Sequence, residues 1–213
     1  MIQTWMADIT PLYELDNYKK YYDKVPEFRK EKADKIRAMQ GKSQSVGAWF
    51  LLMQMRKEYG VPEEAVFNLS HSGQYVLCSI EDSREKSHIQ KIGCDIEMLG
   101  EMKEKIAKRF FCEKEASYIA GRSTEEEKIQ AFYRYWVLKE SFMKATRLGM
   151  KLDMRSFEIG FDKADHAVLL CQPEEIKEKY YYHEYKAENV AAKIAVCSTS
   201  DCFGVLKMPR LFN

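Results

Sequence analysis

The chain has 213 residues, with 34 lysines and arginines against 33 aspartates and glutamates, so its formal net charge is +1. That balance argues against a protein that binds nucleic acid through an overall excess of positive charge. Hydrophobic residues make up 46% of the chain and aromatic residues 13%, which is enough for a packed core and excludes global disorder.

The sequence contains no recognisable targeting signal or membrane span. Residues 1–10 include Asp8 and lack both a basic start and a long apolar run. No stretch reaches the roughly 18 apolar residues of a membrane-spanning helix. Six cysteines are scattered without a Cys-x-x-Cys pair, which favours buried free thiols in a reducing compartment. We therefore expect a cytoplasmic protein that binds neither membranes nor nucleic acids.

Hydrophobic periodicity predicts a mixture of helices and strands. In chain order, the predicted elements are two helices within 26–59, strands at 75–80 and 89–98, helices at 102–110 and from Glu113, a long helix at 124–148, and strands at 156–161, 167–171, 180–185 and 193–198. A polar turn separates the first two strands, so we expect them to form a hairpin. Ser123 and Thr124 begin capping-box patterns at the start of the long helix, which Gly149 is expected to end. This irregular order predicts an α+β fold with mostly antiparallel strands.

Two carboxylates interrupt the hydrophobic pattern of the strand predicted at 89–98. Asp95 and Glu97 project from one face of this strand, about 7 Å apart, opposite a face of apolar residues. Neighbouring carboxylates repel each other, and a hard divalent cation relieves that repulsion because it prefers carboxylate oxygen ligands. The alternative is a solvated sheet edge with two acids that bind nothing, since half-polar strands are common.

A third carboxylate, Glu140, lies within the apolar stripe of the long predicted helix. A carboxylate on a buried face is costly unless it is paired or bound to a metal. Lys144 follows one turn later, so the alternative is an ordinary salt bridge within the helix. The carboxylates and the lysines beside them together suggest a metal-bound diphosphate; they are Asp95, Glu97, Glu140, Lys139 and Lys144.

These residues lie in two motifs that resemble the paired signature of the 4′-phosphopantetheinyl transferases. The motifs are Gly93–Glu97 (GCDIE) and, about forty residues later, Trp136–Lys144 (WVLKESFMK). Asn68–Gly73, and Phe110–Phe111 together with Glu115, resemble two further elements of the family. In length the chain is similar to the long, monomeric members that activate the carrier proteins of peptide and polyketide synthetases.

The resemblance implies a pseudo-dimer of two similar α+β halves, which we place at residues 1–91 and 92–213. The first half would contact the phosphates of coenzyme A, and the second would carry the metal site and the catalytic helix. The implied reaction transfers the 4′-phosphopantetheine arm of coenzyme A to a serine of an apo acyl or peptidyl carrier protein and releases adenosine 3′,5′-bisphosphate. Two alternatives stay open: a non-catalytic relative that binds coenzyme A, and another magnesium-dependent phosphohydrolase.

The resemblance also implies roles for individual residues. Asp95, Glu97 and Glu140 would hold Mg²⁺, with Mn²⁺ as a substitute. Glu140 or Glu115 would take the proton of the carrier serine, directly or through a metal-bound water, and the sequence does not decide between them. Lys144 would stabilise charge on the diphosphate. The residues expected to contact coenzyme A are Arg29, Lys32, Ser45, Ser70, His71, Lys139 and Lys144.

One departure from the family pattern concerns a phosphate contact. Val61 stands where the family has a lysine in a Gly-Lys-Pro loop, so one contact to coenzyme A is expected to be missing. We expect the carrier protein to dock partly through hydrophobic contacts, with Phe110–Phe111 at one edge of the surface and Lys114 attracting the acidic helix of the partner.

Overall fold

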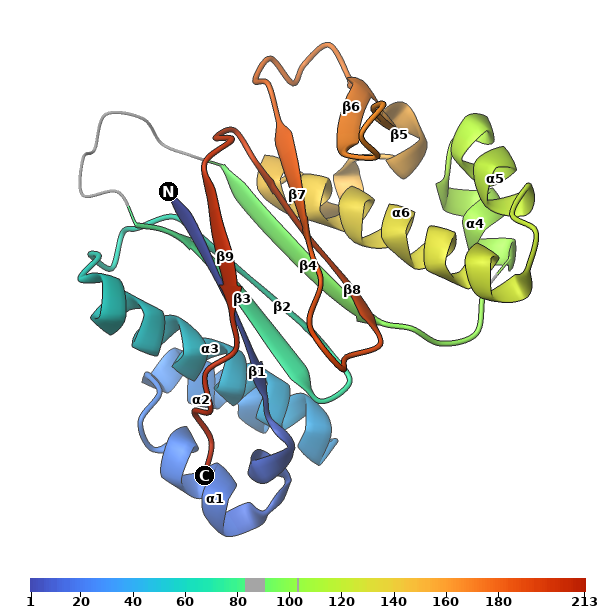
Figure 1. Ribbon diagram of the computed structural model, residues 1–213. Helices are drawn as coiled ribbons and strands as arrows, with labels where there is room; N and C mark the ends of the chain where they lie inside the picture. Colours follow the sequence, from blue (N-terminus) through green and yellow to red (C-terminus); the bar gives the residue numbers. More distant parts are fainter. Residues whose placement is uncertain (83–90, 103) are drawn as a thin grey trace. The chain divides into compact units, whose positions relative to one another are not determined.

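The computed structural model describes residues 1–82, 91–102 and 104–213, so most of the predicted polar turn and the start of the strand predicted at 89–98 lie outside the described residues. The chain divides into two compact units, Met1–Ile89 with Cys202–Asn213, and Gln90–Asp201. Each unit combines a sheet with helices, which confirms the predicted α+β class (Figure 1). None of the described helices is long and apolar enough to cross a membrane.

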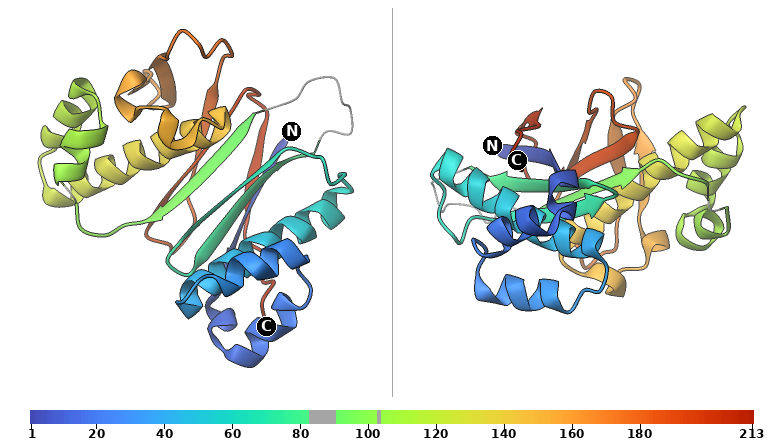
Figure 2. Two further views of the ribbon diagram at one scale, coloured as in Figure 1. Left: turned by 180° about the vertical axis from the view of Figure 1, so that it is seen from behind. Right: turned by 90° about the horizontal axis from the view of Figure 1, so that it is seen from below.

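The first unit is built on a four-stranded sheet in the order β2-β3-β1-β9. Its strands are β1 (Ile2–Asp8), β2 (Phe67–Ser72), β3 (Tyr75–Glu81) and β9 (Phe203–Lys207), and its helices are η1 (Thr10–Tyr13), α1 (Leu15–Tyr22), α2 (Glu27–Asp34) and α3 (Met39–Tyr59). α3 packs on the sheet, and α1 and α2 pack beside it (Figure 2). α2 and α3 confirm the two helices predicted within 26–59, and α3 ends at Gly60, whose φ of 61° stops the helix.

The predicted hairpin between 75–80 and 89–98 is wrong. β3 pairs antiparallel with β1 and β2, whereas β4 (Ile92–Met98) belongs to the other unit and pairs with β8 (Ala192–Ser198). The hairpin that does form joins β2 to β3, with Ser72 opposite Tyr75. Gly73 adopts a φ of 55°, the left-handed conformation that such a tight turn needs.

The C-terminal segment Cys202–Asn213 returns to the first unit, which corrects the expected boundary of the second half at residue 213. β9 runs parallel to β1 and completes the edge of its sheet. The side chain of Phe212 is buried in the core of this unit, and the Tyr21 hydroxyl donates a hydrogen bond to the carbonyl oxygen of Leu211 at 3.1 Å. These contacts satisfy the edge of β1, and no local sequence pattern marks them.

In the second unit, α6 (Glu125–Thr146) packs against β4 and β8 of a three-stranded sheet in the order β4-β8-β7 (Figure 1). The other elements are α4 (Glu104–Phe110), α5 (Glu113–Ala120), η2 (Gly149–Lys151), η3 (Met154–Ser156), β5 (Glu158–Phe161), β6 (Ala167–Cys171) and β7 (Tyr181–Tyr185). The predicted capping box is present, since the Thr124 hydroxyl accepts a hydrogen bond from the Glu127 amide at 3.1 Å. The helix ends earlier than predicted, because Arg147 and not Gly149 takes the left-handed position after Thr146.

Gly93 allows β4 and α6 to touch backbone to backbone. A Cβ atom at this position would lie 2.0 Å from the Ser141 carbonyl oxygen and 2.4 Å from the Ala145 amide nitrogen. Both neighbours are main-chain atoms of a helix and cannot move aside, so a side chain here would push the strand away. Alternate strand residues share a face, so Asp95 projects toward α6 as Gly93 does.

The second unit also contains a buried ion pair that joins several of its elements. Lys139 Nζ, on α6, lies 2.9 Å from Glu115 Oε2, on α5, and these side chains are 0% and 1% exposed. Lys139 Nζ also donates to the carbonyl oxygens of Met154 at 2.7 Å and Phe157 at 2.8 Å. Glu115 Oε1 accepts a hydrogen bond from the Ile159 amide at 2.9 Å. The two charges therefore tie α5, α6, η3 and β5 together.

We expect Lys139→Met to lower the free energy of unfolding by about 3–5 kcal/mol, because it leaves the buried Glu115 carboxylate without its counterion. Glu115→Gln should also destabilise the chain, but the double variant should lose less than the sum of the two, since no isolated charge remains. Urea denaturation measures all three. Arg155→Met, which breaks an exposed pair with Asp153, serves as the control and should change stability by less than about 1 kcal/mol. If the stability losses of the two single variants simply add in the double variant, Lys139 and Glu115 are not energetically coupled.

Candidate functional site

Asp95 on β4 and Lys144 on α6 form the centre of the candidate site. Lys144 Nζ lies 2.6 Å from Asp95 Oδ1 and donates a hydrogen bond to the Cys94 carbonyl oxygen at 3.2 Å. Asp95 is only 4% exposed, which excludes the alternative of a solvated sheet edge. The ion pair therefore crosses from the helix to the strand at the place where Gly93 brings the two together.

Glu140 lies one turn before Lys144 on α6 and is partly buried. Burial raises the pKa of Glu140 and the Asp95 charge raises it further, while Lys144 opposes both. Burial lowers the pKa of Lys144, but the charge and hydrogen bond of Asp95 together with the influence of Cys94 and Glu140 outweigh it, so the pKa of Lys144 lies above its ordinary value. When both are ionised, Glu140 and Asp95 therefore repel each other, and the Lys144 ammonium partly compensates them.

The expected metal site of Asp95, Glu97 and Glu140 stays a prediction, and both Asp95 and Glu97 act electrostatically on Glu140. No group of three His, Cys, Asp or Glu side chains within residues 1–82, 91–102 and 104–213 is placed to hold a metal ion. Glu97 lines a separate small pocket of about 130 Å³. Asp95 and Glu140 alone still suit Mg²⁺, because this ion typically takes one or two carboxylates and completes its octahedron with substrate phosphates and water. The donor set therefore fits a metal that is shared with a bound diphosphate.

A pocket of about 430 Å³ opens beside Glu140. Most of its lining is apolar, with charged side chains from the segment that follows α6. The lining residues are Phe110, Trp136, Glu140, Met143, Lys151, Leu152, Asp153 and Met154. An extended and largely apolar chain attached to a phosphate would fit such a space, with its charged end near Glu140.

The predicted roles of Lys139 as a phosphate ligand and of Glu115 as a base are corrected by the structure. Their side chains are fully buried and neutralise each other in the ion pair described above. Glu115 Oε2 also accepts a hydrogen bond from the Cys112 amide at 3.1 Å, as the third residue of the capping box of α5. The position of Glu115, three residues after the N-cap Cys112, is the sequence signal that favours a structural role.

Among the residues expected to bind coenzyme A, Arg29, Lys32 and Ser45 lie on α2 and α3 of the first unit. The Arg29 guanidinium lies 4.4 Å from the centre of the Trp49 ring, and Ser45 is one turn before Trp49 on α3. Within the described part of the chain, Arg29 Nε and Ser45 Oγ are buried without a hydrogen-bond partner. Burial lowers the pKa of Arg29. Two buried donors without acceptors, with the exposed Lys32 one turn after Arg29, favour an anion as the ligand.

Ser70 and His71 lie on β2 immediately before its turn, in the same unit. Gln40 and Gln44 of α3 donate hydrogen bonds to the Gly73 carbonyl oxygen at 3.0 and 2.8 Å, which holds the turn beside the first half of α3. The two residues point to opposite faces of the strand, and Ser70 is buried while His71 is exposed. The structure therefore offers His71, and not the Ser70 hydroxyl, to a ligand from solvent.

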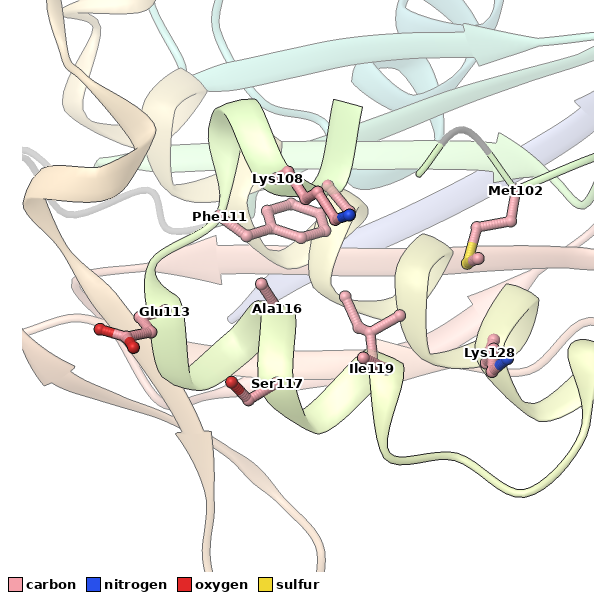
Figure 3. A pocket seen from close by; sticks show the side chains of 10 residues that line it. Met102, Lys108, Phe111, Glu113, Ala116, Ser117, Ile119 and Lys128 are labelled. Atoms are coloured by element: carbon pink, nitrogen blue, oxygen red, sulfur yellow. The ribbon is translucent and has the colours of Figure 1, made fainter. Parts of the chain in front are cut away.

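A third pocket, of about 540 Å³, is lined by residues of α4, α5 and α6 (Figure 3). Phe111 and Ile119 form apolar parts of its lining, and the amines of Lys108 and Lys128 lie at its edges (Figure 3). Phe110 instead lines the pocket beside Glu140, so Phe110 and Phe111 line different pockets. The exposed amine of Lys114 pairs with Glu158 at 3.0 Å.

We expect Glu140→Gln and Asp95→Asn to have opposite effects on stability in the presence of a chelator. The raised pKa of Glu140 means that ionisation destabilises the fold above its ordinary pKa, so the glutamine should add up to about 1 kcal/mol at pH 7. That gain should shrink as the pH falls and wild-type Glu140 becomes protonated. Asp95→Asn should cost about 3 kcal/mol, because Lys144 loses its buried partner. Thermal unfolding measures both effects. Destabilisation by Glu140→Gln at pH 7 would contradict the expectation that the ionised Glu140 carboxylate destabilises the fold.

Comparisons with known proteins bear on the family of the chain. Residues 91–197 match the model of the 4′-phosphopantetheinyl transferase superfamily. 4′-Phosphopantetheinyl transferase Sfp of Bacillus subtilis (strain 168) is 33% identical over 152 residues, which cover 69% of this chain and 63% of that protein. 4′-Phosphopantetheinyl transferase gsp of Aneurinibacillus migulanus is 34% identical over 107 residues, or 49% of this chain and 42% of that protein. The chain thus matches less than two thirds of the length of either relative.

Among solved structures, the holo-[acyl-carrier-protein] synthase of Thermotoga maritima aligns with a TM-score of 0.44 and 18% sequence identity, covering 51% of this chain and 61% of that one. A likeness at this level says nothing about the site. The match to the family model includes both motifs, from Gly93 to Lys144, and extends over half of the sequence. The chain belongs to the 4′-phosphopantetheinyl transferase superfamily.

Proposed function

We propose that this chain transfers the 4′-phosphopantetheine arm of coenzyme A to a serine of an apo acyl or peptidyl carrier protein. The observation that carries the proposal is the convergence of Asp95, Glu140 and Lys144 where β4 touches α6. These residues come from the two motifs inside the segment that matches the family model. Two carboxylates and an ammonium beside a largely apolar pocket suit a substrate that carries both a diphosphate and a long arm.

In the proposed reaction, the serine oxygen forms a bond to the phosphorus that carries the pantetheine arm. The bond from that phosphorus to the bridging oxygen breaks, and adenosine 3′,5′-bisphosphate leaves with this oxygen. The serine proton passes to a base, for which Glu140 is the candidate, because Glu115 is held in its buried ion pair. Lys144 would stabilise the negative charge that develops on the leaving phosphate.

Mg²⁺, when bound, would neutralise charge on the diphosphate, and Mn²⁺ is expected to replace it. Asp95 and Glu140 would hold the ion on the protein side. In the first unit, Arg29, Lys32 and Ser45 would bind the 3′-phosphate of coenzyme A, since Arg29 and Ser45 offer buried donors without acceptors among the described residues. His71 would contact the other phosphates, and we propose that the chain acts as a monomer.

We further propose that the carrier protein docks over the pocket between α4, α5 and α6 (Figure 3). The pocket has an apolar lining with Phe111 and Ile119 and is flanked by Lys108 and by Lys128, which already pairs with Glu125. Lys108 is therefore the main cation there for an amphipathic helix with acidic residues. Lys114 contributes less than expected from the sequence, because Glu158 already neutralises it.

Incubation with coenzyme A, Mg²⁺ and a panel of apo carrier proteins tests the function. We expect one or more carriers to gain the mass of the arm, and we expect Glu140→Gln to lower the rate at least about a hundred-fold, equivalent to about 2.7 kcal/mol. Glu126→Gln, the same change at an exposed position of the same helix, is the control and should retain the rate. Binding of coenzyme A without turnover would indicate a non-catalytic relative. Release of the arm into water without a carrier would indicate a phosphohydrolase.

We expect Lys32→Ala to raise the Michaelis constant for coenzyme A about ten- to a hundred-fold, because a charge-assisted hydrogen bond contributes about 1.5–3 kcal/mol. The loss should be much smaller with 3′-dephospho-coenzyme A, which lacks the phosphate in question. Lys35→Ala, at an exposed position just after the same helix, serves as the control. Equal losses with both substrates would place Lys32 away from the 3′-phosphate.

A further inference from the structure

We propose that Lys144 is a built-in counterion that occupies the metal-binding face of Asp95 until a diphosphate draws it away. The chain alone would then bind Mg²⁺ weakly, and metal and coenzyme A would bind with positive cooperativity. The inference rests on the proposed function only in taking Asp95 and Glu140 as metal ligands. It assigns Lys144 a role before the substrate arrives, in addition to its proposed role in the reaction.

The geometry of the ion pair is the first argument. Lys144 Nζ lies 2.6 Å from Asp95 Oδ1, and Asp95 is almost fully buried. Mg²⁺ binds carboxylate oxygens at about 2.0–2.1 Å with near-octahedral geometry. An ammonium and a divalent cation on one buried carboxylate would repel each other strongly at low dielectric. The metal ion can therefore bind the Asp95 carboxylate tightly only if Lys144 moves.

Backbone packing fixes the position of the ion pair between Lys144 and Asp95. β4 and α6 touch at Gly93, where an added Cβ would lie 2.9 Å from the Lys144 Cβ. Lys144 also donates to the Cys94 carbonyl oxygen, so two oxygens of β4 hold its amine. The counterion position is thus a property of the packed unit and forms whether or not a ligand is present.

The charges of the site favour movement of Lys144 when a diphosphate binds. When ionised, Asp95 and Glu140 carry two negative charges, Glu97 also acts electrostatically on Glu140, and the Lys144 ammonium offsets one charge. A diphosphate beside the site offers Lys144 another anionic partner, so the free energy of moving the ammonium falls when the substrate is present. A ligand that lowers this free energy raises the affinity for metal, and by linkage the metal raises the affinity for the diphosphate by the same factor.

Binding of Mn²⁺, followed by the electron paramagnetic resonance of the free ion, tests the inference without turnover. We expect Lys144→Met to bind Mn²⁺ at least about tenfold more tightly than wild type in the absence of coenzyme A, within the usual range of coupling factors. Lys144→Arg, which keeps the charge, should stay close to wild type. Lys179→Met, an exposed lysine in the same unit, should also match wild type. Unchanged or weaker Mn²⁺ binding by Lys144→Met would overturn the inference.

A second measurement on wild type alone keeps the test valid if the methionine variant fails to fold. Adding coenzyme A should raise the affinity of wild type for Mn²⁺ at least about fivefold, and no change would also overturn the inference. Failure of the proposed function would be separate, since the metal experiments would then succeed while no carrier protein gained the arm. Transfer with no difference in Mn²⁺ affinity between wild type and Lys144→Met would reject the counterion and keep the function.

Discussion

The backbone contact between β4 and α6 at Gly93 determines how the charged groups of the second unit meet. The space there is so small that a Cβ would lie 2.0 Å from a helix carbonyl oxygen. Asp95, two residues along the strand, is thereby brought within 2.6 Å of Lys144. A wider spacing between strand and helix would separate them, and the Asp95 carboxylate would be buried without its ammonium, at a cost of several kcal/mol. Gly93 therefore matters because it has no side chain, which allows the strand and the helix to touch.

Two lysines of one motif have different surroundings because of helix geometry. Lys139 and Lys144 are five residues apart, so their side chains diverge by about 140° around the helix axis. Lys139 consequently points into the core, where Glu115 and main-chain carbonyl oxygens neutralise it, while Lys144 points toward β4. Glu140 is next to Lys139 in sequence but lies one helical turn from Lys144. The buried pair anchors η3, whose Met154 lines the pocket beside Glu140, so the core charge also shapes the site.

What the sequence predicted well depends on local pattern. The long helix and its cap at Thr124 follow from short-range periodicity and a compact capping motif. The misses are non-local. β9 pairs with β1 across nearly the whole chain, and the hydrogen bonds that place it there leave no trace in neighbouring residues. For Glu115, the capping-box position is a local signal of a structural role, but its ion pair with Lys139 forms only when α5 packs against α6.

The two units support the proposed function in different ways. The family match, residues 91–197, falls inside the second unit, so motif and geometry both support the proposed metal and diphosphate site there. The proposed phosphate site of the first unit lies outside that segment and is supported by the family resemblance and by the surroundings of Arg29 and Ser45. A partly buried guanidinium stacked on Trp49 has lost hydration, and no described acid pairs with Arg29. Such a group is unfavourable in the free chain and becomes favourable when an anion binds, which is the behaviour that recognition of a phosphate requires.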